Sequence, residues 1–185
     1  MTFAGIIESR IAIPDGVTVS MDGNTFSVKG KKGELSRNFS HPRVNVSVAD
    51  GEVVVSCEYP RIKDKAMVGT FHAHVRNMFR GVTEGYTYQM KIVFNHFPMK
   101  VAVNKNEKRL EINNYMGGHA TRYAKFVGNV DVKVSGSDVT VSGINIEEVG
   151  QTAANIEKST MRGGFDKRVF EDGIYIVHKS HKVKE

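Results

Sequence analysis

Residues 46–56 have the sequence VSVADGEVVVS, and residues 132–142, 86 positions later, have the sequence VKVSGSDVTVS. In both stretches, valines alternate with other residues and flank a short polar turn that contains Gly and Asp. Apolar residues at a period of two on both sides of such a turn are typical of a β-hairpin. The similarity predicts that the chain contains the same hairpin twice.

Two further pairs of stretches occur in the same order along the chain. Residues 17–28 resemble residues 101–112 at an offset of 84, again with the pattern of hairpins. Residues 68–75 resemble residues 149–156 at an offset of 81. Chance could supply one pair of valine-rich hairpins, but three pairs in one order indicate an internal duplication.

The third pair has the periodicity of a helix. Val68, Phe71 and Val75 recur at steps of three and four, which places them on one face of a helix near residues 63–80. The second copy, near residues 146–158, repeats the pattern. Both apolar stripes are expected to be core faces.

The fold class is therefore expected to be α+β, with two tandem duplicated domains and a basic C-terminal extension. Each domain is an antiparallel sheet with one long helix packed on one face. Gly81 is expected to take the left-handed position that ends the first helix. Asn145 and Glu148 have the spacing of a capping box at the start of the second. The predicted end of the first helix places the domain boundary after residue 82, which gives domains of residues 1–82 and 83–185.

Composition narrows the class of protein. The chain has 185 residues, 40% hydrophobic and 25% charged, which is typical of a globular protein. No apolar run approaches the roughly 18–20 residues that span a bilayer, and the N-terminus lacks the pattern of a secretory signal. A single Cys excludes an internal disulfide framework. We expect a reducing, cytoplasmic setting and no membrane partner.

The charged residues are distributed unevenly along the chain. Lys and Arg total 26 against 20 Asp and Glu, a net charge of +6, and residues 158–185 alone carry 7 basic and 4 acidic residues. A basic terminus indicates an anionic partner, although a solvated, sticky tail is an equally open reading of charge alone.

No clustered catalytic residues stand out. Cys57 shares a strand face with Val53 and Val55, which favours a buried and inert side chain. His72 and His74 are two positions apart on a helix, so they point about 200° apart and cannot bind one metal ion. We therefore expect no catalytic residue, no metal site, no cofactor and no small-molecule substrate.

The segment that begins at Lys158 has a composition suited to nucleic acid. Basic residues alternate with three aromatic residues, and the glycines at 163–164 allow a close approach of the backbone. Lys and Arg neutralise phosphates, while aromatic rings and Arg planes stack on exposed bases. Because the segment shows no core pattern of its own, it is expected to be an RNA-contacting extension. The alternative is an edge strand over residues 173–177 with a solvated tail.

Within this segment, residues 168–176, RVFEDGIYI, closely resemble the C-terminal signature of the sixth large-subunit ribosomal protein family (L-six) in its archaeal and eukaryotic form. Residues 96–98, followed by Val101, resemble the opening of the second half of that family. Residues 141–156 resemble the strand–helix segment of its second domain. The resemblance covers almost the whole chain, whereas the bacterial form of the family has a different C-terminal segment.

The resemblance implies a non-catalytic structural constituent of the large ribosomal subunit with two similar α+β domains. It implies binding to large-subunit ribosomal RNA, chiefly through the second domain, near the stalk base, the sarcin–ricin loop and the factor-binding region. The implied partners are this RNA and neighbouring large-subunit ribosomal proteins near the stalk base. The matching RNA-side positions are Arg162, Gly163, Gly164, Lys167, Arg168, Phe170 and Tyr175, with Lys158 and Lys179 as neighbours. Phe170 and Ile174 could instead pack against the domain.

Two other classes of function stay open at this stage. A non-ribosomal adaptor for nucleic acid or protein, without catalysis, would use open sheet edges, although the basic and Gly-rich terminus argues against an adaptor for protein. An enzyme could assemble its site from dispersed residues such as His96, Asp172 and Cys57, but no sequence pattern favours it.

Overall fold

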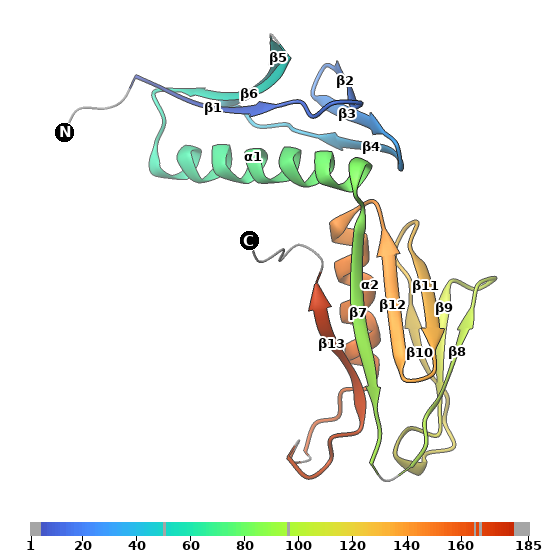
Figure 1. Cartoon of the computed structure of the whole chain (residues 1–185). Coiled ribbons are helices and arrows are strands. Elements are labelled where there is room, and N and C mark those ends of the chain that lie inside the picture. The colour runs from blue at the N-terminus through green and yellow to red at the C-terminus, as the bar shows by residue number, and fades with distance from the viewer. Residues whose placement is uncertain (1–4, 50, 96, 165, 167, 180–185) are drawn as a thin grey trace. The chain divides into compact units, whose positions relative to one another are not determined.

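The computed structural model describes residues 5–49, 51–95, 97–164, 166 and 168–179. The chain divides into two compact units, Met1–Gly85 and Tyr86–Glu185 (Figure 1). The division falls three residues after the predicted one between residues 82 and 83. None of the described helices is long and apolar enough to cross a membrane.

The described residues of the first unit form two antiparallel sheets and one helix. The elements are β1 (Ile6–Ala12), β2 (Thr18–Asp22), β3 (Thr25–Gly30), β4 (Gly33–Asn38), β5 (Val44–Ala49), β6 (Glu52–Glu58) and α1 (Ile62–Thr83). One sheet has the strand order β1-β6-β5, and the other has the order β2-β3-β4. The hairpins predicted at residues 17–28 and 46–56 are the pairs β2–β3 and β5–β6.

The core of the first unit is formed by alternate strand residues and one face of α1. In β6 every second residue is buried, and in β3 Phe26 and Val28 are buried; Val28, Val53 and Val55 are fully buried. The predicted helical stripe is also buried, since Val75 is fully buried and Phe71 is 8% exposed. Burial of apolar surface on both sides explains why the helix lies on this sheet face.

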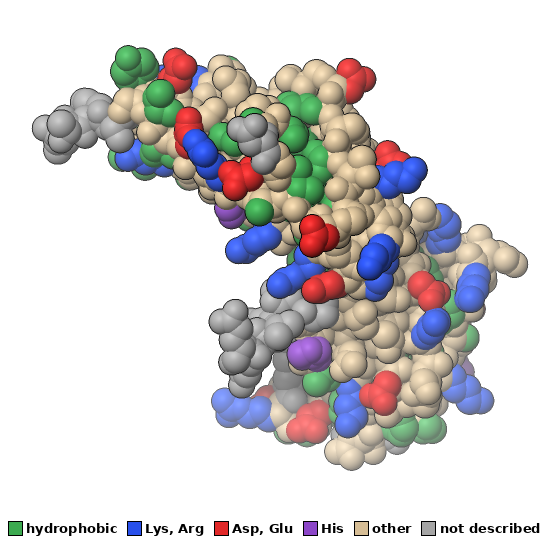
Figure 2. All heavy atoms as spheres, turned by 45° about the horizontal axis from the view of Figure 1, so that its top comes forward, with side chains coloured by type: hydrophobic (Ala, Val, Ile, Leu, Met, Phe, Trp, Pro, Cys, Tyr) green, Lys and Arg blue, Asp and Glu red, His purple; other side chains and the backbone are tan. Residues whose placement is uncertain are grey.

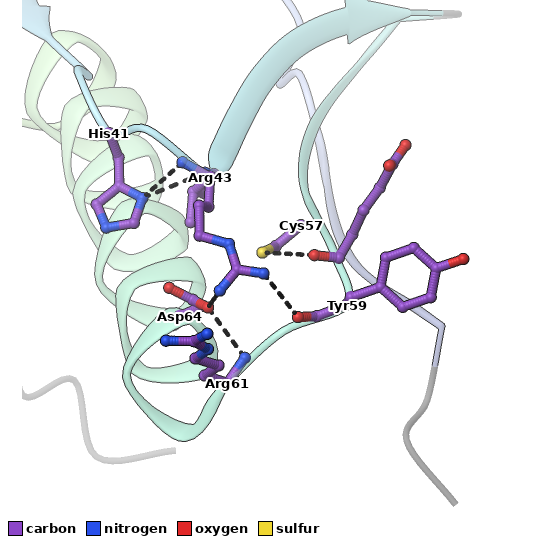
Figure 3. Close-up of polar contacts among 8 residues, drawn as sticks. His41, Arg43, Cys57, Tyr59, Arg61 and Asp64 are labelled. Carbon is purple, nitrogen blue, oxygen red and sulfur yellow. Dashed lines mark hydrogen bonds and ion pairs between the residues drawn. The ribbon is translucent and has the colours of Figure 1, made fainter.

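The start of α1 is held by a buried carboxylate, which Figure 3 shows beside the guanidinium of Arg43. Asp64, in the first turn, accepts the backbone N–H of Arg61 at 2.9 Å and Nη1 of Arg43 at 3.0 Å. Such a carboxylate satisfies an N–H that has no partner within the helix and interacts favourably with the helix dipole. Nη2 of Arg43 also donates to the carbonyl of Tyr59 at 3.2 Å, so one side chain joins the helix start to the loop before it.

The prediction that Gly81 ends the first helix is wrong. Gly81 is buried inside α1, which continues to Thr83. The helix continues because Val82 is fully buried, and its carbonyl accepts the backbone N–H of Lys32 at 3.0 Å. The left-handed residue is Gly85, with φ of +75°, whose N–H donates to the carbonyl of Arg80 at 3.0 Å.

Cys57 is buried, as predicted, with 2% of its surface exposed. Its Sγ donates weakly to the carbonyl of Glu58 at 3.6 Å (Figure 3). We expect Cys57→Ala to lower the free energy of unfolding by about 1–2 kcal/mol because it leaves a small cavity. Urea unfolding of both chains measures the difference, and RNA binding is expected to be unchanged. Rapid modification of Cys57 by a thiol reagent in the native protein would contradict this prediction.

The described residues of the second unit repeat this arrangement with one strand more. The elements are β7 (Tyr86–Val93), β8 (Lys100–Asn104), β9 (Arg109–Asn113), the 3₁₀ turn η1 (Tyr115–Gly117), β10 (Arg122–Lys125), β11 (Asp131–Ser135), β12 (Asp138–Gly143), α2 (Ile146–Ser159) and β13 (Gly173–Lys179). The sheets have the orders β11-β12-β7-β13 and β10-β9-β8. The predicted hairpins at residues 101–112 and 132–142 are the pairs β8–β9 and β11–β12.

The two units have equivalent topologies, element by element. The order β1-β6-β5 corresponds to β7-β12-β11, and β2-β3-β4 corresponds to β8-β9-β10. The helix α1 packs on β1, β3, β6 and β4, and α2 packs on β7, β12 and β10, the equivalents of β1, β6 and β4. The predicted α+β fold of two duplicated domains is confirmed. Only β13 lacks a counterpart among the described strands of the first unit.

The start of α2 departs from the predicted capping box in two details. The side chain of Asn145 accepts the backbone N–H of Glu147 at 3.1 Å. The carboxylate of Glu148 accepts the side-chain amide of Asn145 at 3.1 Å and the backbone N–H of Asn129 at 2.9 Å. The carboxylate of Glu148 therefore contacts the side-chain amide of Asn145, the cap residue, and also the backbone N–H of Asn129.

Candidate nucleic-acid interface

The C-terminal segment begins where α2 ends and returns to the sheet as β13 (Figure 1). β13 pairs antiparallel with β7 at the edge of the four-stranded sheet, with Gly173 opposite Val93 and Ile174 opposite Ile92. Ile174 is fully buried in the core of the second unit. The prediction that this segment has no core pattern of its own is therefore wrong. Only two apolar residues at alternate positions, Ile174 and Ile176, face the core from this strand. Two such residues are too few to form a recognisable pattern among the surrounding charged residues.

Tyr115, which no sequence pattern indicated as a functional residue, holds the two ends of the segment together. It is 6% exposed, and its hydroxyl donates to the carbonyl of Thr160 at 2.6 Å and lies 3.3 Å from the carbonyl of Asp172. The side chain of Thr160 in turn accepts the backbone N–H of Ile174 at 3.0 Å. These bonds close residues 161–172 into a loop with fixed ends. The partners are 45 and 57 positions from Tyr115 along the chain, so no local pattern could have indicated them.

Two further contacts hold the base of the loop. The guanidinium of Arg122 donates to the carbonyl of Ser159 at 2.8 Å, with its central carbon 4.2 Å from the centroid of the Tyr115 ring. The carboxylate of Asp172, which is 3% exposed, accepts the backbone N–H of Asn95 at 2.9 Å. Asp172 is thus engaged in a structural contact of the second unit, whereas Cys57 belongs to the first unit and His96 lies outside the described residues.

The predicted RNA-side residues of the loop are exposed above this fixed base. Arg162, Gly163, Gly164 and Arg168 are all exposed, and Gly164 has a φ of +84°. A Cβ added at Gly163 or Gly164 would meet no atom of the described residues within 4 Å. The space beside these glycines is therefore open to a partner. Lys167 lies outside the described residues.

The remaining predicted residues lie on the elements that flank the loop. Lys158 is exposed in the last turn of α2. Tyr175 and Lys179 are exposed in β13; the Tyr175 hydroxyl donates to the carbonyl of Glu171 at 3.0 Å, and Nζ of Lys179 lies 6.0 Å from the centroid of the Tyr88 ring. All the described members of the predicted set thus belong to α2, the loop or β13.

Two tyrosine hydroxyls of this region have shifted pKa values. Burial is the main cause that raises the pKa of Tyr115, partly opposed by the charge of Arg122. Burial, followed by the charge of Asp172, raises the pKa of Tyr175. Both hydroxyls therefore keep their protons at neutral pH and remain hydrogen-bond donors to backbone carbonyls.

A pocket of about 250 Å³ opens between the C-terminal end of α2 and the loop. Its walls include Tyr115, Met116, Met161, Phe170 and Tyr175, and its charged side chains are those of Glu157, Arg162 and Asp172. The structure thus brings together three of the predicted residues, Arg162, Phe170 and Tyr175, and adds others that the sequence did not indicate.

Charge alone does not locate a binding surface. On the face shown in Figure 2, Lys and Arg side chains are interspersed with Asp and Glu over the described residues. Among these residues, no group of three or more His, Cys, Asp or Glu side chains is placed to hold a metal ion. On the face shown in Figure 2, the described residues therefore form no single extended positive surface.

Comparison with known proteins gives a match over most of the chain. A family model described as ribosomal protein L6 matches residues 13–85 and 97–173. The two matched stretches fall within the two duplicated units, and the second ends at the first residue of β13.

Three archaeal relatives are similar over nearly their full lengths, each named large ribosomal subunit protein uL6. The protein of Methanobrevibacter smithii is 49% identical over 179 residues, which cover 97% of this chain and 99% of that protein. The protein of Methanosarcina mazei is 50% identical over 174 residues, with 94% and 98% covered. The protein of Desulfurococcus amylolyticus is 48% identical over 174 residues, with 94% and 95% covered.

The duplicated α+β fold and these matches define a ribosomal protein without enzymatic activity. The chain belongs to the ribosomal protein L6 family. The predicted family is confirmed, and the readings as a non-ribosomal adaptor or as an enzyme are not supported.

Proposed function

We propose that this protein is a structural constituent of the large ribosomal subunit and binds large-subunit ribosomal RNA, chiefly through its second domain. The observation that carries this proposal is the identity of 48–50% with three proteins that are named as large-subunit proteins. The predicted domain boundaries, residues 1–82 and 83–185, belong to the same proposal.

The proposed RNA surface is the exposed loop with its flanking residues. Arg162 and Arg168 supply charges for phosphates, and Gly163 and Gly164 leave open space for a sugar–phosphate strand. The fixed base of the loop supports the proposal because a site with fixed ends loses less conformational entropy on binding. Lys158, Lys167 and Lys179 add charge at the periphery.

The proposed place in the subunit is near the stalk base, the sarcin–ricin loop and the region where elongation factors dock. The partners there are the RNA and neighbouring ribosomal proteins. This position follows from the family resemblance of residues 168–176, and Arg162, Lys167 and Arg168 of the loop provide the positive charges that such a position requires.

The proposal predicts that the tagged full-length protein co-sediments with large subunits in gradients at high salt. It also predicts that the purified protein binds large-subunit RNA in preference to small-subunit RNA, with an affinity that falls as salt increases. Sedimentation with small subunits, or at the top of the gradient, would contradict the ribosomal assignment. Equal binding to both RNAs would contradict specific recognition.

A further inference from the structure

The pocket beside the loop has the size and lining of a site for one planar ring. Its volume of about 250 Å³ is below the roughly 300–1,000 Å³ of pockets that hold drug-sized ligands. Phe170 and Tyr175 supply aromatic surface, and Met116 and Met161 supply polarizable sulfur. Aromatic side chains stack on unpaired bases, and thioethers make favourable contacts with aromatic rings.

Of the two carboxylates that line the pocket, that of Glu157 has no partner in the part of the chain that the structure describes. The carboxylate of Glu157, in the last turn of α2, is half-buried and makes no hydrogen bond or ion pair among the described residues. The neighbouring backbone acceptors are occupied: the carbonyl of Glu157 accepts the N–H of Thr160 at 3.2 Å, and the carbonyl of Thr160 accepts the hydroxyl of Tyr115. An N–H donor that enters the pocket would therefore meet the carboxylate.

The lining of the pocket carries both signs of charge: the carboxylates of Glu157 and Asp172 are negative, the Asp172 carboxylate already accepts the backbone N–H of Asn95, and Arg162 is positive. The C-terminal end of a helix carries a partial negative charge, and Glu157 adds a full one, so this side favours N–H donors. Arg162 follows α2 and contributes a positive charge, with Nη1 3.8 Å from Sδ of Met116. A nucleotide fits this polarity when its base faces Glu157 and its phosphate faces Arg162.

Guanine matches the acceptor best among the four bases. Its Watson–Crick edge presents N1–H and N2–H side by side, and the two oxygens of a carboxylate can accept both. Adenine and cytosine present a ring-nitrogen acceptor beside their amino group, and uracil presents one N–H between two carbonyls. These acceptors would be repelled by the carboxylate.

We propose that the pocket between α2 and the loop binds one unpaired guanine of the large-subunit RNA, with Glu157 accepting its N1–H and N2–H, Phe170 and Tyr175 contacting its ring, and Arg162 its phosphate. This inference rests on the proposed function, since it names the base that the same surface recognises.

The test asks whether removal of one negative charge strengthens or weakens the binding of the protein to RNA. Glu157→Gln raises the net charge of the protein, so electrostatics alone would strengthen its binding to RNA. If Glu157 accepts guanine, the substitution instead weakens binding about tenfold, because the amide opposes one of the two donors. Glu171→Gln is the matched control: it makes the same charge change in the same segment, at an exposed residue that does not line the pocket.

The full-length protein and its variants are bound to purified large-subunit RNA, and unpaired guanines are probed with kethoxal, which reacts at N1 and N2. Wild type and Glu171→Gln are expected to protect the same unpaired guanine, and Glu157→Gln is expected to leave it reactive. Phe170→Leu tests the ring contact and is expected to reduce the protection. Thermal unfolding of each variant shows whether its fold is intact.

The outcomes separate this inference from the proposed function. If the wild type does not bind the RNA, the proposed function fails. If the wild type binds with the expected salt dependence but protects no unpaired guanine, or if Glu157→Gln binds as tightly as wild type, the guanine site is wrong and the proposed function stands. If Glu157→Gln binds the RNA normally but enters large subunits poorly, the pocket holds a basic side chain of a neighbouring protein, which also overturns the guanine site.

Discussion

Replacing Ile174 with Ala is expected to lower the free energy of unfolding of the second unit by about 2–5 kcal/mol. Ile174 is fully buried, lies opposite Ile92 in β7, and is held by the bond from its N–H to the side chain of Thr160. Its loss leaves a cavity beneath the edge strand and loosens the end of the loop. The expected effect is large because β13 has few other buried side chains among its described residues.

Urea unfolding followed by tyrosine fluorescence measures this effect. The chain has no Trp, and five of its six tyrosines belong to residues 86–185, so the signal reports mainly on the second unit. Val177→Ala is the matched control on the same strand, because Val177 is 67% exposed. It is expected to change stability by less than about 0.5 kcal/mol. Equal effects of the two substitutions would show that β13 is not part of the core.

The hairpins and the apolar helix faces could be predicted because local periodicity determines them. Residues 46–56 and 132–142 carry alternating valines around a polar turn, and they form β-hairpins whose valines are mostly buried. The collinear offsets also predicted the shared topology of the two units. Each of these features depends on residues that are close together in the chain.

The features that could not be predicted depend on contacts between distant residues. The end of α1 was misplaced because Val82 packs against Gly30, where a Cβ would lie 2.8 Å from the Val82 side chain. The loop anchor at Tyr115 and the pocket lined by Glu157 are likewise products of tertiary structure. The sequence therefore predicted the exposed charges of the interface, but not the pocket beside them.

Removing Arg162, Lys167 and Arg168 together is expected to have the largest effect on RNA binding. Each phosphate contact that is lost reduces the slope of log affinity against log salt by about 0.7–0.9, so the triple Ala variant is expected to lose about 2–3 units of slope. Arg162 and Arg168 are exposed, so the fold is expected to remain intact. Circular dichroism and thermal unfolding check that it does.

The control removes the same charge from the first unit. Lys29, Lys31 and Lys63 are exposed residues of β3, the β3–β4 turn and α1. Lys32 is kept, because its Nζ donates to the carbonyl of Glu84 and its loss would affect the end of α1. The control triple Ala variant has the same net charge as the test variant, so nonspecific attraction to RNA is reduced equally in both.

Filter binding of these two variants and the wild type to large-subunit RNA across a salt series tests most directly whether the loop of the second unit is the RNA surface. The account predicts that the Arg162/Lys167/Arg168 variant loses both affinity and salt slope, and that the Lys29/Lys31/Lys63 variant keeps nearly all of both. The reverse result, with affinity and slope lost in the Lys29/Lys31/Lys63 variant alone, would place the principal RNA surface in the first unit and contradict the account.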